Sequence, residues 1–235
     1  MTGRHNDMPD RTIDGASIIV VGASGGIGRH IVNQLAERGA RLTLVARDVT
    51  RLESRGNSNV VAADLRDAEA GRRIVAAALA TNGRLDGLVN AAGVVAFGPL
   101  ADTDDDVIED LFLTNVLGPL WLMRAALPAL TESRGFVANI SGVVAEQPLA
   151  GMAAYAASKA AMTAADRALA RELRAAGITV TDARPPHTET GLADRPLTGV
   201  APKLREGLKP DAVARRIVAA IIAGEREIPG DAFSA

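Results

Sequence analysis

The stretch that decides the fold is Ser17-Ile-Ile-Val-Val21, followed directly by Gly22-Ala-Ser-Gly-Gly-Ile-Gly28. The apolar, β-branched run is typical of a short strand buried on both faces, and a helix is expected over residues 29–38. Glycine allows a tight turn, and a helix start offers unpaired N–H groups to an anion. The unit therefore favours nucleotide binding over glycines that only shape a turn.

The same alternation of strand and helix continues along the chain. It predicts an α/β fold with a doubly wound parallel sheet in three α/β/α layers, whose ligand lies beyond the carboxyl ends of the strands. We expect one domain over residues 15–235, a flexible polar tail over 1–14 and a short substrate-loop region at about 186–209. Further strands are expected at residues 41–46, 59–63, 86–90, 135–140 and 178–183.

Composition excludes several classes of protein. Hydrophobic residues make up 48% of the chain, charged residues 23%, and the net charge is -2, as in a soluble globular protein. Aromatic residues are only 3%, with no basic run, so no nucleic-acid partner is expected. The sequence has no cysteine, no apolar leader and no long apolar run, so we expect no thiolate metal site, no membrane partner and a cytoplasmic location.

A pair of functional side chains is predicted in Tyr155-Ala-Ala-Ser-Lys159, within an alanine-rich helix. Residues four apart share a helix face, so the phenol and the ammonium can serve one site. A nearby cation lowers a phenol pKa from its usual value of about 10, which would make Tyr155 an acid and base near neutral pH. The alternative is a surface tyrosine before a solvated lysine.

A second candidate lies in Asn115-Val-Leu-Gly-Pro119, inside a helix whose expected N-cap is Thr103. Proline has no N–H, so Pro119 leaves the backbone carbonyl of Asn115 without its helical donor. The free carbonyl could hold a water that extends a proton path from Lys159. A kink that only serves packing is the alternative.

The second and third strands end where a cofactor's adenosine would lie. After Ala46, which offers no carboxylate, Arg47 could bind a 2′-phosphate, so we expect NADP(H), with NAD(H) possible because Asp48 follows. Asp64 and Leu65 are expected to contact adenine at the end of the third strand.

Together these residues resemble the short-chain dehydrogenase/reductase family, single-domain oxidoreductases with a Rossmann fold. The matching motifs are Gly22-x₃-Gly26-x-Gly28, Asn90-Ala-Ala-Gly93, Asn115 and the Tyr155/Lys159 pair, and the resemblance covers about residues 15–190. It implies hydride transfer between nicotinamide and a carbonyl or secondary alcohol. Tyr155 would be the acid and base, Lys159 would hold the nicotinamide ribose, and Asn115 would anchor the relay water.

The predicted cofactor-binding residues share a position beside a strand end or on the following loop. They are Gly22, Ser24, Gly25, Gly26, Ile27, Gly28, Arg47, Asp64, Leu65, Asn90, Ala91, Gly93, Tyr155, Lys159, Pro185, Thr188 and Thr190.

The sequence departs from the family pattern near the expected reaction centre. Where the family usually has a catalytic serine, thirteen residues before the tyrosine, this chain has Gly142. Its neighbour Ser141 is the substitute candidate, although adjacent side chains on a strand point to opposite faces. Loss of one oxyanion donor costs roughly a hundred- to a thousand-fold in rate. Pro185-Pro186 replaces the usual Pro-Gly, so the loop beside the nicotinamide should follow another path.

Two functions are therefore weighed. The first is an NADP(H)-dependent reductase or dehydrogenase for a carbonyl compound or alcohol; the second is a cofactor-binding protein with weak or no turnover, favoured by Gly142. The expected substrate pocket, at residues 94–97, 143–152 and 188–208, is mostly apolar and has no charged cluster. Small residues on the Tyr155 helix favour a homodimer or homotetramer.

Overall fold

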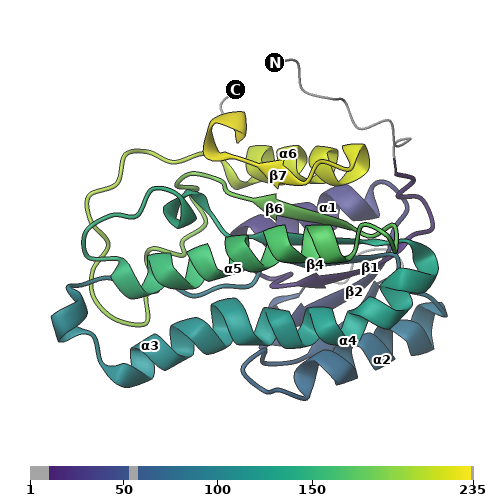
Figure 1. Cartoon of the computed structure of the whole chain (residues 1–235), viewed down its shortest axis with the longest axis horizontal. Coiled ribbons are helices and arrows are strands. Elements are labelled where there is room, and N and C mark those ends of the chain that lie inside the picture. Colours follow the sequence, from purple (N-terminus) through teal and green to yellow (C-terminus); the bar gives the residue numbers. More distant parts are fainter. Residues whose placement is uncertain (1–10, 53–57, 234–235) are drawn as a thin grey trace.

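The sheet follows the predicted doubly wound plan. The computed structural model describes residues 11–52 and 58–233, and in this part seven parallel strands lie in the order β3-β2-β1-β4-β5-β6-β7. Parallel neighbours need crossover connections, and the helices between the strands supply them (Figure 1). The strands are β1 Ser17–Val21, β2 Arg41–Ala46, β3 Ser58–Ala62, β4 Gly87–Asn90, β5 Phe136–Ile140, β6 Thr179–Ala183 and β7 Glu227–Ile228.

Helices cover both faces of the sheet and complete the three layers (Figure 1). One buried cluster joins α1 and α6 to the strands, and a second joins α2, α4 and α5 to the other face. The α-helices are α1 Gly26–Ala36, α2 Ala70–Asn82, α3 Asp105–Phe112, α4 Gly118–Ser133, α5 Ala153–Glu172 and α6 Pro210–Ala223. Short 3₁₀ turns are η1 Val49–Arg51, η2 Leu100–Asp102, η4 Val143–Ala145 and η5 Gly230–Phe233.

The long helical stretch between β4 and β5 differs from the prediction in two details. Its N-cap is Asp104 and not Thr103, whose hydroxyl instead donates to Pro99 O at 3.0 Å. A π-helical turn, η3 Leu113–Leu117, joins α3 to α4, where a proline kink was expected. Pro119 then lies in the first turn of α4, which continues directly from η3.

The same stretch, Asp105–Ser133, is long and apolar enough to cross a membrane by length and composition alone, with a mean hydropathy of 1.2. In this fold 44% of its most apolar window is buried inside the protein. Leu122, Ala126 and Leu130 pack on the sheet, which accounts for much of that apolar character.

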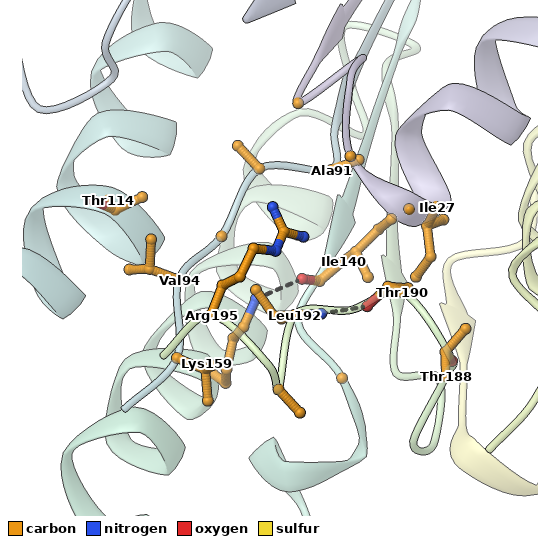
Figure 2. Close-up of a pocket in the computed structure, with 18 of the residues that line it drawn as sticks. Ile27, Ala91, Val94, Thr114, Ile140, Lys159, Thr188, Thr190, Leu192 and Arg195 are labelled. Carbon is orange, nitrogen blue, oxygen red and sulfur yellow. Dashed lines mark hydrogen bonds between the residues drawn. The ribbon is translucent and has the colours of Figure 1, made fainter. Parts of the chain in front are cut away.

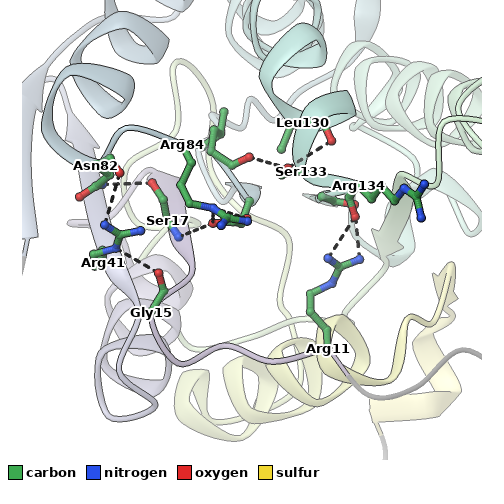
Figure 3. Close-up of polar contacts among 12 residues, drawn as sticks. Arg11, Gly15, Ser17, Arg41, Asn82, Arg84, Leu130, Ser133 and Arg134 are labelled. Carbon is green, nitrogen blue, oxygen red and sulfur yellow. Dashed lines mark hydrogen bonds and ion pairs between the residues drawn. The ribbon is translucent and has the colours of Figure 1, made fainter.

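The amino and carboxyl ends of the strands have different roles. The carboxyl ends of the strands open onto a pocket, shown in Figure 2. The amino ends are closed by arginine contacts, shown in Figure 3: Arg41 donates to Gly15 O, and Arg84 pairs with Asp86 just before β4. Hydrogen bonds and an ion pair therefore close the amino ends of the strands, and the carboxyl ends open onto the pocket.

The first described residues already pack on the domain. Ile13 is only 4% exposed, and Arg11 donates to Gly135 O at 3.3 Å while its guanidinium lies 5.0 Å from the centre of the Phe136 ring (Figure 3). The predicted boundary of the flexible tail, at residue 14, therefore lies too far along the chain, because Arg11 and Ile13 already pack on the domain. Residues 1–10 lie outside the described part.

Candidate active site

The pocket lies along the carboxyl edge of the sheet, where segments from distant parts of the chain meet (Figure 2). Its volume is about 420 Å³, within the range of small-molecule sites. It is lined by the loops that follow β1, β2, β3, β4, β5 and β6 and by the first two turns of α5. A parallel sheet brings such loops together because all its strands end at the same edge.

The glycine-rich turn after β1 forms one wall by close backbone packing. Gly22 has a φ of 74°, and a Cβ there would lie 2.7 Å from the backbone of Ala91. A Cβ on Gly28 would lie 2.1 Å from Gly22 O. Both positions therefore require glycine. Gly22 has a positive φ and no space for a Cβ, whereas Gly28 only lacks the space.

The start of α1 suits an anionic group. Its N-cap, Gly25, has no side chain to bond the first N–H groups, and no acidic residue lies in the first turn. The free N–H groups and the helix dipole therefore act toward the pocket without compensation from the chain itself. Thr190 packs beside them, since a Cβ on Gly26 would lie 2.4 Å from Thr190 Cβ. The diphosphate of a dinucleotide fits this wall.

Most predicted cofactor residues line the pocket. They are Gly22, Ser24, Gly25, Gly26, Ile27, Arg47, Asp64, Leu65, Ala91, Gly93, Tyr155, Lys159, Pro185, Thr188 and Thr190. Two predicted residues are absent from this lining. Gly28 lies beneath Gly22, and the amide oxygen of the buried Asn90 accepts from Ala92 N at 3.4 Å, so both shape the turns from behind.

The end of β2 presents two cations to the pocket. Arg47 and Arg51 both line it, and Arg51 had not been singled out from the sequence. The competing carboxylate, Asp48, accepts from Thr50 N at 3.0 Å and from Thr50 Oγ1 at 2.6 Å, as the cap of η1. These hydrogen bonds hold the pKa of Asp48 below its usual value. Positive charge therefore predominates where an adenosine ribose would lie.

Asp64 is tied to neighbouring side chains. Its Oδ2 accepts from Arg66 Nη2 at 2.8 Å and from Arg66 Nε at 3.1 Å, and Arg66 also pairs with Asp110 at 3.0 Å. These bonds compete with the adenine contact predicted for Asp64. Leu65 is buried and offers the pocket an apolar surface.

Lys159 is buried beneath the pocket and anchored to a strand end. It is 7% exposed, and its Nζ donates to Ile140 O at 2.9 Å (Figure 2). Burial lowers its pKa to about 8, against the opposing charge of Asp182. The ammonium is therefore held in a fixed place at the floor of the site.

The prediction of a lowered Tyr155 pKa is wrong for the protein without ligand. Burial raises the pKa of Tyr155 to about 12, because Val95, Phe97, Val144 and Met152 form an apolar cluster around the ring. Lys159 Nζ is 5.9 Å from the centre of the ring. At that distance the cation does not offset the loss of water, so the phenol stays protonated at neutral pH.

Asn115 holds the site together through its side chain. Its Oδ1 accepts from Val94 N at 2.9 Å, and its Nδ2 donates to Val94 O at 2.9 Å and to Ser158 Oγ at 3.1 Å. The amide thus joins the π-helical turn to the loop after β4 and to α5. Its neighbour Thr114 lines the pocket, while Asn115 does not. Water binding at the Asn115 carbonyl remains a prediction.

Ser141 does not provide the missing catalytic hydroxyl. The residue is 1% exposed, and its Oγ makes a short hydrogen bond to Asp182 on β6. Asp182 in turn pairs with Arg184 at 2.6 Å. Ser141 borders the pocket, but its hydroxyl is engaged by Asp182 and is not free to donate to a substrate, which argues against the predicted catalytic role of Ser141.

Gly142 leaves space at the position next to Ser141. Its φ is 93°, and the nearest atom to a Cβ there would be Pro185 O at 3.8 Å. The adjacent backbone donors are already bonded: Ser141 N and Gly142 N donate to Ala183 O, and Val143 N donates to Pro185 O. These three N–H groups are therefore not free to replace the serine hydroxyl.

The expected substrate loops do line the other half of the pocket. Their residues include Val94, Val95, Phe97, Val143, Val144, Gln147, Leu149, Met152, Leu192, Ala193 and Leu204. Mixed with these is Arg195, a cation that nothing in the sequence distinguished from a surface arginine.

Comparison with known proteins agrees with this architecture. Residues 16–198 match a family model described as short chain dehydrogenase. A short chain dehydrogenase of Pseudocercospora fijiensis (strain CIRAD86) is 36% identical over 177 residues, which are 71% of this chain and 57% of that relative, so the match spans less than two thirds of its length.

Two solved structures superpose closely. A short chain dehydrogenase of Burkholderia cenocepacia J2315 in complex with NADP has a TM-score of 0.81 and 26% identity, covering 92% of this chain and 88% of that one. A short chain dehydrogenase/reductase of Burkholderia phymatum in complex with NAD has a TM-score of 0.85 and 24% identity, covering 93% and 90%. The second supports the fold alone.

Proposed function

Because the chain belongs to the short-chain dehydrogenases, we propose that it is an oxidoreductase that moves a hydride between NADP(H) and a carbonyl compound or secondary alcohol. The observation that carries the proposal is that one pocket joins an uncapped helix start to the Tyr155 and Lys159 side chains. An anion site and an acid–base pair that line one cavity suit a dinucleotide with its reactive end at Tyr155.

Each side chain then has a distinct task. The start of α1 and Thr190 bind the diphosphate, and the bound nicotinamide supplies or accepts the hydride. Lys159, fixed by Ile140 O, holds the nicotinamide ribose. Tyr155, protonated at neutral pH, donates its proton to the carbonyl oxygen as it becomes an alcohol.

A substitution at Tyr155 tests the acid–base role. Tyr155→Phe removes the proton donor and retains the ring that packs in the apolar cluster, so turnover should fall by about 10²- to 10⁴-fold. Reduced-nicotinamide fluorescence should show unchanged cofactor binding. A variant that reduces carbonyl compounds as fast as the original protein would exclude Tyr155 as the acid.

The preference for NADP(H) rests on Arg47 and Arg51 and on the engaged carboxylate of Asp48. A guanidinium binds phosphate in a fork geometry, which the 2′-phosphate of NADP(H) supplies and NAD(H) lacks. Arg47→Ala should therefore weaken NADPH binding by about tenfold or more and leave NADH binding nearly unchanged. Equal weakening of both cofactors, measured by fluorescence titration, would contradict this role.

A second candidate function is cofactor binding with weak or no turnover. Two observations favour it: Gly142 supplies no hydroxyl, and the Ser141 hydroxyl is bonded to Asp182. Titration with NADPH and NADH, followed by a panel of aldehydes and ketones, separates the two candidates. Tight cofactor binding without reduction of any compound would favour the second candidate, and steady turnover would favour the first.

A further inference from the structure

Arg195 lines the pocket from the loop that also carries Leu192 and Ala193. It lies on the connection between β6 and α6, and Figure 2 shows its side chain reaching from that loop into the cavity, with the guanidinium directed toward the Ala91 side. Its Nε donates to Gly191 O at 2.9 Å. This bond fixes the stem of the side chain and leaves the two terminal nitrogens directed outward.

The loop that carries Arg195 is held on both sides. Before it, Leu192 N donates to Thr190 Oγ1 at 3.2 Å; after it, Leu197 N donates to Val95 O at 2.8 Å. Leu192 also packs into the apolar cluster that surrounds Tyr155. The apolar cluster that raises the pKa of Tyr155 therefore also helps to hold the Arg195 loop beside Tyr155.

Within the described residues, the terminal nitrogens of Arg195 have no carboxylate partner within ion-pair distance. Asp194 is adjacent in the chain but makes no such pair. The two pocket carboxylates face elsewhere, since Asp48 caps η1 and Asp64 pairs with Arg66. The other two pocket arginines, Arg47 and Arg51, likewise have no ion pair among the described residues, but they follow β2 at the expected adenosine side. Arg195 is therefore an exposed guanidinium at the pocket with no carboxylate partner among the described residues.

We propose that Arg195 binds an oxyanion of the substrate, so that the preferred substrate is a carbonyl compound that also carries a carboxylate. The inference rests on the proposed function and adds its substrate class. A guanidinium matches a carboxylate in geometry, and the apolar residues beside it take the carbon chain between the acid and the carbonyl. Cofactor phosphate is the other source of the same chemistry, and the start of α1, with Arg47 and Arg51, already provides for it.

The test uses matched acids and esters. Reduction of acetoacetate, levulinate and phenylglyoxylate by the full-length protein is compared with reduction of their methyl esters. The original protein should prefer the acids in kcat/KM. Arg195→Met should lose that preference by about tenfold or more, because KM should rise for the acids much more than for the esters. Arg195→Lys should keep part of it, because the charge remains and the fork is lost.

Arg205→Met is the matched control. Arg205 lies on the same connection and is exposed, but it does not line the pocket. This variant should keep the original preference for acids. Fluorescence titration of both methionine variants with NADPH gives a readout that does not depend on turnover, and Arg195→Met should bind the cofactor as tightly as the original protein.

Three results would overturn the proposal, and they are distinguishable. Equal reduction of acids and esters by the original protein would remove the substrate class but leave the oxidoreductase function intact. Weaker NADPH binding by Arg195→Met, with an unchanged acid preference, would assign Arg195 to the cofactor phosphate. Cofactor binding with no reduction of any acid, ester or simple ketone would remove the proposed function and this inference with it.

Discussion

Two glycine turns at the same edge of the sheet require glycine for different reasons. Gly22 follows β1 with a φ of 74°, and a Cβ there would lie 2.7 Å from backbone atoms of Ala91. Gly142 follows β5 with a φ of 93°, yet a Cβ there would meet nothing closer than Pro185 O at 3.8 Å. The first turn is closed by backbone packed on backbone. The second requires glycine by its backbone angle alone and leaves space open to the site.

The surroundings of the two turns differ in the same way. Beside Gly22 lie helix N–H groups and small residues, which bind without gaining or losing a proton. Beside Gly142 lies a buried polar network in which Ser141 bonds to Asp182, Asp182 pairs with Arg184, and Asn139 bonds to Asp166. The turn at Gly22 therefore offers fixed hydrogen-bond donors to a ligand. The turn at Gly142 lies over a buried network that includes Asp166, whose charge depends on pH.

The largest effect should follow from filling the first turn. Gly22→Ala places a methyl group against the backbone of Ala91 at a positive φ, which combines overpacking of about 1–3 kcal/mol with a backbone cost of about 1 kcal/mol. We expect a strongly lowered Tm and loss of cofactor binding, measured by thermal unfolding and fluorescence titration. A Gly22→Ala variant with an unchanged Tm and normal cofactor binding would show that the turn can accommodate a methyl group.

The next effect concerns the buried acid below the second turn. Burial raises the pKa of Asp166 from 3.8 to about 8, and the charge of Asp182 adds to the rise. The folded protein therefore keeps a proton that the unfolded chain releases, so this group makes stability fall as pH rises between about 4 and 8. Asp166→Asn keeps the shape without the charge, and its Tm should fall less over that range.

Asp102→Asn is the control for this measurement, because Asp102 is exposed in η2. The Tm of the Asp102→Asn variant should differ from that of the original protein by the same small amount at every pH. If Asp166→Asn keeps the pH dependence of the original protein, then Asp166 is not the group that causes it.

The smallest effect compares two residues at Gly142. Gly142→Ala and Gly142→Ser share the strain of a side chain at a φ of 93°, a cost of about 1–3 kcal/mol, and differ only in a hydroxyl. Both should lower Tm by the same amount, whereas the serine variant should reduce carbonyl compounds faster than the alanine variant because its hydroxyl enters the open space. Equal rates in the two variants would show that this space is not next to the reacting oxygen.

The cofactor half of the site could be predicted from the sequence because its determinants are local. The run Ser17–Val21 and the glycines after it specify strand, turn and helix start within twelve residues, and the structure has them in that order. The Tyr155 and Lys159 spacing likewise places both side chains on one helix face at the pocket.

The reaction side could not be predicted in the same way because its determinants come from distant segments. The direction of the Ser141 hydroxyl is set by Asp182, which lies on β6. The raised pKa of Tyr155 arises from an apolar cluster whose members belong to three loops and α5. The position of Arg195 depends on hydrogen bonds to Thr190 and Val95 that hold its loop from both sides. No local pattern encodes these contacts.

The contacts of Arg11 across the start of β5 have a practical consequence. They fasten the first described residues near the amino ends of the strands (Figure 3), and the pocket lies at the carboxyl ends (Figure 2). A surface or carrier joined to the chain on the amino-terminal side of Arg11 would therefore leave the pocket facing solution. The fold thus has a natural point of immobilisation, and an electrode or resin could hold the protein there while substrate enters from the other side.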